Sequence, residues 1–414
     1  MHLFDFYVFV AVSGLLIFGL GLVSRELKAH VGPPVLIVLV GIALAAAMPQ
    51  PHEDLLDDLE TLSWFAVGFG VASIALRFRR IDMHKMWRPA ALITSCAMCG
   101  MWAVSSLVVW ALFDVPVSLA VLVGAIVTPT DPVVASSIVT GPFAEKHIPP
   151  RIRTLLSLES GANDGLGFAF VFLPMLLLEH GQSGWIEWIQ NILLWQVVCA
   201  TLVGSGSGWL AGKVCDIAIS RGEWRHLEIL LVSIAFTVLV LGLMKVLAMD
   251  SIWALFVAAM VFSFLLPLDQ REAANAFHEG IVYVTMVPAL LVFGMTLPWA
   301  EWLRFGPAAI AAIAAVLLLR RLPVIGLVYA FIRTPTLPSE PEERLDQPFA
   351  APRDLWFCGW FGPIGLSAVY YATTAHRLLG DARVWPIASL LVFGSIVVHG
   401  VTAAIGTRWY ARAA

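Results

Sequence analysis

Long runs of apolar residues recur from one end of this 414-residue chain to the other. A helix needs about 20 apolar residues to cross the hydrocarbon core of a bilayer, and by that measure hydropathy predicts about 13 membrane spans. They fall near residues 4–23, 33–49, 60–78, 90–113, 116–139, 154–178, 190–213, 226–248, 252–267, 280–298, 307–330, 356–373 and 385–406. The runs are too long for transmembrane strands and lack their alternation. The predicted fold class is an all-α polytopic membrane protein, with one membrane domain over about residues 1–406.

The composition supports this fold class and excludes others. Hydrophobic residues make up 59% of the chain and charged residues 13%, whereas about a quarter of the residues in a soluble domain are charged. A formal net charge of −4 gives no indication of a nucleic-acid partner. Cys96 and Cys99 form a C-x-x-C inside an apolar run, without the additional ligands that a zinc site needs. We therefore expect a lipid bilayer as partner, no nucleic acid and no cofactor.

The basic residues predict how the spans are oriented. Loops that follow odd-numbered spans, together with the C-terminal tail, contain 19 of the 25 lysines and arginines. Cytoplasmic loops of membrane proteins carry such an excess of positive charge. The N-terminus is therefore predicted to lie outside and the C-terminus in the cytoplasm, and an error of one span would have scrambled this asymmetry.

The fifth predicted span contains the sequence Thr128-Pro129-Thr130-Asp131-Pro132. Two prolines three residues apart remove two backbone donors, so an unbroken helix cannot pass through them. Non-helical backbone at membrane depth is tolerated only where protein or a water-filled cavity satisfies it. We expect Asp131 in an unwound segment that crosses another; the alternative is a surface loop between two short helices.

The sixth predicted span carries two acids with different surroundings. Ser160 and Asp164 share one helix face with Asn163 on its flank, while Glu159 points about 140° away from Asp164. Acids at membrane depth are costly and indicate function. Asp164 is predicted to face a cavity, whereas Glu159 needs a buried cation.

The eleventh span contains two adjacent arginines that could supply that cation. Arg320 is the expected partner of Glu159, because its guanidinium stays charged and grips a carboxylate with two donors. Arg321 is expected instead to reach the cytoplasmic headgroups, as basic residues near span ends do.

A second interrupted helix is predicted in the twelfth span, where Gly362 and Pro363 lie near mid-depth. Spans one to six and eight to thirteen then form two six-helix halves, about residues 1–180 and 226–406, joined by span seven at 190–213. The interrupted spans 5 and 12 are the fifth members of their halves. Broken segments at matching positions indicate inverted repeats with a site where the broken helices cross.

The chain resembles the NhaP-type cation–proton antiporters and their animal relatives, the sodium/hydrogen exchangers. The resemblance rests on Gly32-Pro33-Pro34, Thr130-Asp131-Pro132, Glu159-Ser160, Asn163-Asp164-Gly165 and the stretch from Ser395 to Thr402. It implies a homodimer in which a dimerisation part and a moving six-helix core are interleaved in sequence and work as an elevator. The chain departs from the family at Phe361-Gly362, where many members have Arg-Gly, and in having no acid at 61–76.

The resemblance also implies roles for individual residues. Asp164 corresponds to the carboxylate that binds Na⁺ or a proton, and Ser160 to a neighbouring ligand. Thr130 corresponds to a backbone contributor at the unwound crossing. Asp131 and Asn163 correspond to a pair that orients the site, and Glu159 and Arg320 to a buried ion pair that holds the core together.

The expected function is secondary antiport, not enzymatic catalysis. Burial disfavours the ionised form of Asp164 and a bound cation favours it, so proton and cation compete for one carboxyl group. With Asn163 in place of a second acid, electroneutral 1:1 exchange is the simpler expectation. The alternatives are K⁺/H⁺ antiport on the same fold, a cation channel, or an intramembrane enzyme that uses Asp131 and Asp164. The expected location is a bacterial-type plasma (inner) membrane.

Overall fold

The computed structural model describes residues 3–22, 32–47, 52–131, 141–221, 226–332 and 352–412. Pro132 and the rest of the predicted fifth span lie outside these ranges. Every regular element within them is a helix. The elements up to residue 187 are α1 (Leu3–Leu22), α3 (Pro33–Ala47), α4 (His52–Ala75), α5 (Arg80–Leu112), α6 (Val117–Ile126), α8 (Gly141–His147), α9 (Pro150–His180), η1 (Gly181–Ser183) and α10 (Gly184–Glu187). Those that follow are η2 (Trp188–Cys199), α11 (Ala200–Ser220), α12 (His226–Val246), α13 (Ser251–Leu265), α14 (Leu268–Met295), α15 (Trp299–Phe305), α16 (Pro307–Leu319), α17 (Leu322–Ile332), α19 (Pro352–Trp360), α20 (Leu366–Leu379) and α21 (Val384–Arg412).

The described helices match the predicted fold class. Six helical stretches are long and apolar enough to cross a membrane, and four shorter apolar helices accompany them. Several helices extend beyond the predicted apolar runs. Helix α14, for example, begins at Leu268, whereas hydropathy predicted a span from about residue 280, because the first turns of this helix are polar and were not counted. Hydropathy detects only the part of a helix that faces lipid or core, so these polar turns escaped it. The count of thirteen spans and the inverted repeats stay predictions.

Local signals fix several helix ends. Asp250 caps α13, since its Oδ1 accepts hydrogen bonds from the backbone N–H groups of Ile252 (2.9 Å) and Trp253 (3.2 Å). Gly380 ends α20 in the left-handed region, at φ 64°, and its N–H donates to His376 O. These caps set where α13 and α20 begin and end.

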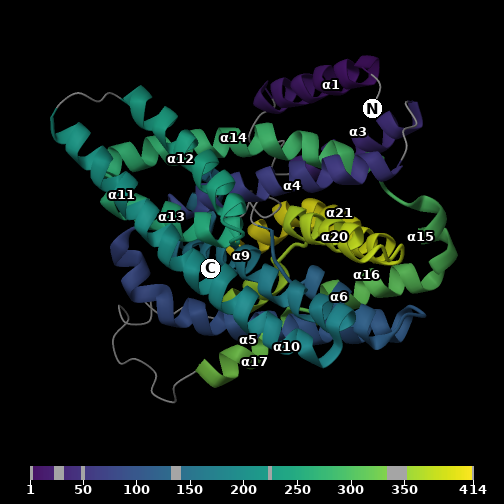
Figure 1. The fold of residues 1–414 in the computed structure, drawn as a ribbon. Helices are drawn as coiled ribbons and strands as arrows, with labels where there is room; N and C mark the ends of the chain where they lie inside the picture. Colours follow the sequence, from purple (N-terminus) through teal and green to yellow (C-terminus); the bar gives the residue numbers. More distant parts are fainter. Residues whose placement is uncertain are drawn as a thin grey trace.

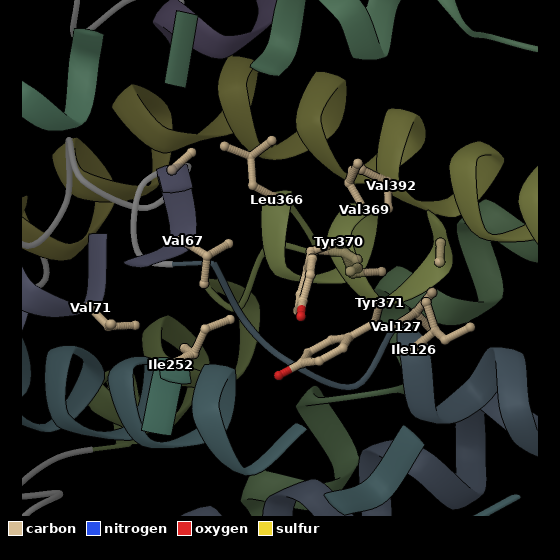
Figure 2. Packing of buried hydrophobic residues seen from close by; sticks show 14 of the residues in the cluster. Val67, Val71, Ile126, Val127, Ile252, Leu366, Val369, Tyr370, Tyr371 and Val392 are labelled. Atoms are coloured by element: carbon tan, nitrogen blue, oxygen red, sulfur yellow. The ribbon is translucent and has the colours of Figure 1, made fainter. Parts of the chain in front are cut away.

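Two C-terminal helices occupy the middle of the molecule. Figure 1 shows α20 and α21 between α4 on one side and α6 on the other, while α1 lies at the periphery beside α14. Side chains from four elements meet in this interior (Figure 2): Val67 of α4, Ile252 of α13, Ile126 of α6, and Tyr370 and Tyr371 of α20. The face of α20 that carries the two tyrosines is thus surrounded by protein.

A ridge of glycines on α11 packs against α13 inside the same chain. A Cβ atom on Gly204 or Gly208 would overlap the carbonyl oxygens of Ala254 or Ala258, and one on Gly212 would overlap Leu265. Small residues let two helix backbones approach closely in a membrane. The ridge is therefore accounted for by contact within one subunit.

This close approach makes Gly208 sensitive to the addition of one methyl group. We expect Gly208→Ala to destabilise the protein by about 1–3 kcal/mol, because α11 must move away from α13. Gly206 lies on the same helix and has nothing within 4 Å of its added Cβ, so Gly206→Ala serves as the matched control. Thermal unfolding in detergent measures both variants. Equal melting temperatures for the two would contradict the tight packing.

Three interruptions break the helices around one region. After α6 the chain is non-helical from Val127 to Asp131, and between α19 and α20 it is non-helical over residues 361–365, which include Gly362 and Pro363. A third break, which the hydropathy pattern did not predict, separates α16 from α17 at Arg320 and Arg321. Pro323 lies two residues after Arg321, and its missing N–H weakens the helix there.

Candidate ion-binding site

The two non-helical segments cross and bond to each other. The backbone N–H of Asp131 donates to the carbonyl of Pro363 at 2.8 Å. The Asp131 carboxylate accepts a hydrogen bond from the N–H of Leu366, the first residue of α20. A Cβ atom on Gly365 would overlap this carboxylate, so only glycine allows the approach. Asp131 is therefore held against the N-terminus of α20, where the helix dipole favours a negative charge.

The crossing is buried, which excludes the alternative of a surface loop. Thr128 and Thr130 are 0% exposed, and Asp131 is 2% exposed. Pro129 packs over Gly167 of α9, where a Cβ atom would stand 2.7 Å from the proline ring. Backbone groups freed by the break are thus satisfied inside the protein, as a non-helical segment at membrane depth requires.

Asn163 ties the crossing to α9. Its Oδ1 accepts from Thr130 N at 3.0 Å, and its Nδ2 donates to Thr130 Oγ1 at 2.8 Å and to Glu159 Oε1 at 3.2 Å. The Thr130 and Ser160 hydroxyls lie 3.0 Å apart and share a further hydrogen bond. Because all these groups are buried and bonded, the network fixes the position of the unwound segment relative to α9.

The buried ion pair of Glu159 forms with Arg321, so the expected pairing with Arg320 is wrong. Arg321 Nη1 and Nη2 donate to the two carboxylate oxygens of Glu159 at 2.6 and 2.8 Å. Arg321 is 3% exposed, which also overturns the expectation that it reaches the lipid headgroups. Adjacent residues on a helix point about 100° apart, and the break before Pro323 turns Arg321 rather than Arg320 toward α9.

Arg320 binds backbone carbonyls of both crossing segments. Its Nη1 donates to Val127 O and, at 3.4 Å, to Thr128 O, while its Nη2 donates to Gly362 O. Arg320 is 2% exposed. Its charge therefore compensates carbonyls that no helix satisfies. Positive charge beside Phe361-Gly362 thus comes from the break between α16 and α17.

Asp164 differs from the other buried acids because its carboxyl group is not fully satisfied. The residue is 2% exposed, and its Oδ1 has no hydrogen-bond partner. Ser367 of α20 lies beside this carboxyl, and its own Oγ is likewise buried without a standard hydrogen bond. A buried polar atom without a partner is costly and calls for an occupant such as a proton, water or ion.

Neighbouring groups explain why Asp164 can change its charge. Asp131 and Glu159 are the acids that act on it electrostatically, and both disfavour a third negative charge. Glu159 is paired with Arg321, and Asp131 accepts a hydrogen bond from the start of α20, but no cation is paired with Asp164 in the described part of the chain. The arrangement can therefore hold a proton or a cation at Asp164, and not an uncompensated carboxylate.

The helices around Asp164 are packed closely. Gly161 and Gly165 face Phe256 and Trp253 of α13, where an added Cβ would come within 2.7 Å. The hydroxyl of Tyr371 on α20 donates to the backbone carbonyl of Asp164 at 2.5 Å. Asp164 thus lies where α9, α13 and α20 meet.

Sequence reasoning missed Arg321, Ser367 and Tyr371 as neighbours of the site. Ser367 and Tyr371 follow the predicted break and are four residues apart on α20, so they lie on one face of that helix. This spacing was the signal from which their position beside the site could have been predicted. His399 is buried and bonded within the fold, with Nε2 3.0 Å from Trp360 O and Nδ1 3.1 Å from Ser395 Oγ.

The fold and the site together define a polytopic helical membrane protein in which two interrupted segments cross beside a buried aspartate. The chain belongs to the sodium/hydrogen exchanger family: the family model described as "Sodium/hydrogen exchanger, transmembrane" matches residues 12–409.

Relatives and solved structures agree with this membership. The chain is 31% identical over 374 residues to Na⁺/H⁺ antiporter 2 of Zygosaccharomyces rouxii, covering 81% of this chain and 44% of that protein. It is 23% identical over 403 residues to the K⁺/H⁺ antiporter NhaP2 of Shewanella oneidensis, covering 95% and 66%. The structure of the sodium proton antiporter MjNhaP1 from Methanocaldococcus jannaschii has the same fold, with a TM-score of 0.72, 15% identity and coverage of 98% and 100%.

Proposed function

We propose that this protein is a secondary antiporter that exchanges protons for Na⁺ or another monovalent cation across a membrane by alternating access. The observation that carries the proposal is the buried Asp164 carboxyl, whose Oδ1 lacks a partner, whereas Glu159 is paired with Arg321 and Asp131 accepts a hydrogen bond from the N–H of Leu366. Proton and cation each neutralise this group, so each displaces the other. A site that is charged and empty is expensive to move through apolar surroundings, which couples the two fluxes.

The surrounding network supplies the remaining parts of the proposed site. Ser160 stands one turn before Asp164 on α9 and offers a hydroxyl oxygen, and the segment around Thr130 offers backbone carbonyls. Oxygen ligands of this kind suit hard cations such as Na⁺. Asp131 and Asn163 hold the crossing in place without binding the ion, and the Glu159–Arg321 pair anchors the helices that carry it.

The assembly and orientation belong to the same proposal. The protein forms a homodimer whose six-helix core moves against a dimerisation part, with the N-terminus outside and the C-terminus in the cytoplasm of a bacterial-type plasma (inner) membrane. The excess of basic residues in the odd-numbered loops supports the orientation. The backbone bond between Asp131 and Pro363 supports two repeats that cross at their broken helices.

One titrating carboxyl group implies electroneutral exchange. Asn163 occupies the position next to Asp164 and is neutral, and its side chain is fully used by Thr130 and Glu159. We expect the proton flux that a Na⁺ gradient drives in proteoliposomes to be the same with and without a membrane potential, which is imposed as a K⁺ diffusion potential with valinomycin. A flux that changes severalfold with the sign of the potential would contradict 1:1 stoichiometry.

The experiment that tests the function is proton flux driven by imposed cation gradients. Purified protein is reconstituted into vesicles containing a pH dye, and Na⁺, Li⁺ and K⁺ gradients are compared. The proposal expects alkalinisation or acidification that reverses with the gradient and saturates with cation concentration. K⁺ is included because the Shewanella relative carries the name K⁺/H⁺ antiporter. Cation flux without counterflow of protons would indicate a channel and overturn the proposal.

A further inference from the structure

An apolar groove opens on the outer surface of the helices next to the crossing. It has a volume of about 520 Å³ and lies between α19, α21 and the start of α17. Its walls carry three tryptophans, Trp356, Trp360 and Trp409, of which Trp356 is 63% and Trp409 48% exposed. Tryptophans with one apolar and one polar edge concentrate at the level where lipid tails meet headgroups.

Positive charge gathers at one end of this groove. Arg353 precedes Trp356 by one turn of α19, and Arg412 follows Trp409 by one turn of α21. The start of α19 and the end of α21 are neighbours, because Tyr410 OH donates to Asp354 Oδ1 at 2.5 Å and Arg353 stacks over the Tyr410 ring. Both arginines therefore stand at the same end of the groove.

Among the described residues at that end, the acid is already neutralised; residues 333–351, which precede α19, lie outside the described ranges. Asp354 is the acid of α19, it is fully buried, and it pairs with Arg151 at 2.9 Å as well as with Tyr410. Helix α21, from Val384 to Arg412, contains no acid at all. The groove thus combines a long apolar trough with a basic rim, which complements an acyl chain attached to an anionic headgroup.

The floor of the groove is part of the transport machinery. Phe361, the first residue of the non-helical segment 361–365, lines it, and a Cβ atom on Gly406 of α21 would overlap the Phe361 ring. Arg320 donates to Gly362 O in this segment, and Arg321 donates to Cys358 O of α19, just before it. An occupant of the groove therefore contacts the segment 361–365 through Phe361.

We propose that this groove binds an anionic phospholipid of the cytoplasmic leaflet, with an acyl chain between the tryptophans and the phosphate at Arg353 and Arg412. The choice of leaflet rests on the orientation given with the proposed function. Arginine is suited to this role because its guanidinium forms paired hydrogen bonds with phosphate oxygens. A zwitterionic lipid fills the same trough but gains less from the basic rim.

The test measures lipid retention by native mass spectrometry of purified protein titrated with phosphatidylglycerol or phosphatidylcholine. We expect the wild-type protein to retain phosphatidylglycerol about 30-fold more tightly, because two basic residues near a membrane surface each add about 1 kcal/mol. The double variant Arg353→Gln/Arg412→Gln should lose this preference. Arg304→Gln, on α15 away from the groove, is the matched control and should keep it.

A second variant tests the trough itself. Ile405 is 64% exposed in the groove, and Ile405→Trp should fill it and lower retention of both lipids. Ile310 is 75% exposed on α16, outside the groove, and Ile310→Trp should change nothing. Unchanged phosphatidylglycerol preference in the double arginine variant, or unchanged retention in Ile405→Trp, overturns the proposal. Because Asp164→Asn protein is expected to bind lipid normally, this readout is independent of whether the chain transports ions.

Discussion

Replacing Asp164 by asparagine is expected to abolish cation-driven proton exchange. The amide has nearly the same shape as the carboxyl group, but it neither releases a proton nor attracts a cation. Asp164 is 2% exposed and its Oδ1 is unpaired, so the variant breaks no hydrogen bond at that oxygen. The rate should fall at least about 100-fold, to that of protein-free vesicles, as expected when the group that carries the transported ion is removed.

The matched control for this variant is Asp216→Asn. Asp216 lies on α11, is half exposed, and forms a surface pair with Lys213 at 3.6 Å. The same chemical change there should leave exchange at the wild-type rate. Both proteins should show the same melting temperature in detergent, which separates lost transport from lost folding. An Asp164→Asn protein that still exchanges protons for cations would end the assignment of the site.

The sequence was sufficient for features that depend on local backbone chemistry. Prolines and glycines mark where a helix cannot continue, and the non-helical segments 127–131 and 361–365 lie at Pro129 and Gly362-Pro363. Helical spacing likewise places Ser160 and Asn163 on the side of α9 that meets Thr130. Both inferences use only the geometry of a single helix, which the sequence specifies directly.

The partner of Glu159 could not be read from the sequence, because it depends on how distant helices are rotated. Arg320 and Arg321 differ by one position, and the break before Pro323 decides which faces α9. Hydropathy treated residues 307–330 as one straight span, so it gave no information on that rotation. The roles of Tyr371 and Ser367 are equally tertiary: both depend on α20 packing against α9 after the chain resumes its helix.

Breaking the Glu159–Arg321 pair is expected to cost about 3–5 kcal/mol of stability, because either change leaves one buried charge without its partner. Glu159→Ala and Arg321→Ala should each lower the melting temperature strongly. The double variant should lose less than the sum of the two, since no unpaired charge remains. This non-additivity identifies the pair more clearly than any single substitution.

A second double-mutant cycle, in which Arg320 replaces Arg321, is the control. It tests which of the two arginines pairs with Glu159. Arg320→Ala should also destabilise the protein, because it frees the carbonyls of Val127 and Gly362. Its coupling to Glu159→Ala should nevertheless be weaker than that of Arg321→Ala, since Arg320 donates to backbone carbonyls, whereas Arg321 donates to both oxygens of Glu159. Strong coupling of Glu159 to Arg320 and none to Arg321, measured by thermal unfolding in detergent, would reverse the assignment. Stronger coupling to Arg321 would mean that the break between α16 and α17 supplies two buried cations with separate roles: Arg321 for the Glu159 carboxylate and Arg320 for the carbonyls of the crossing.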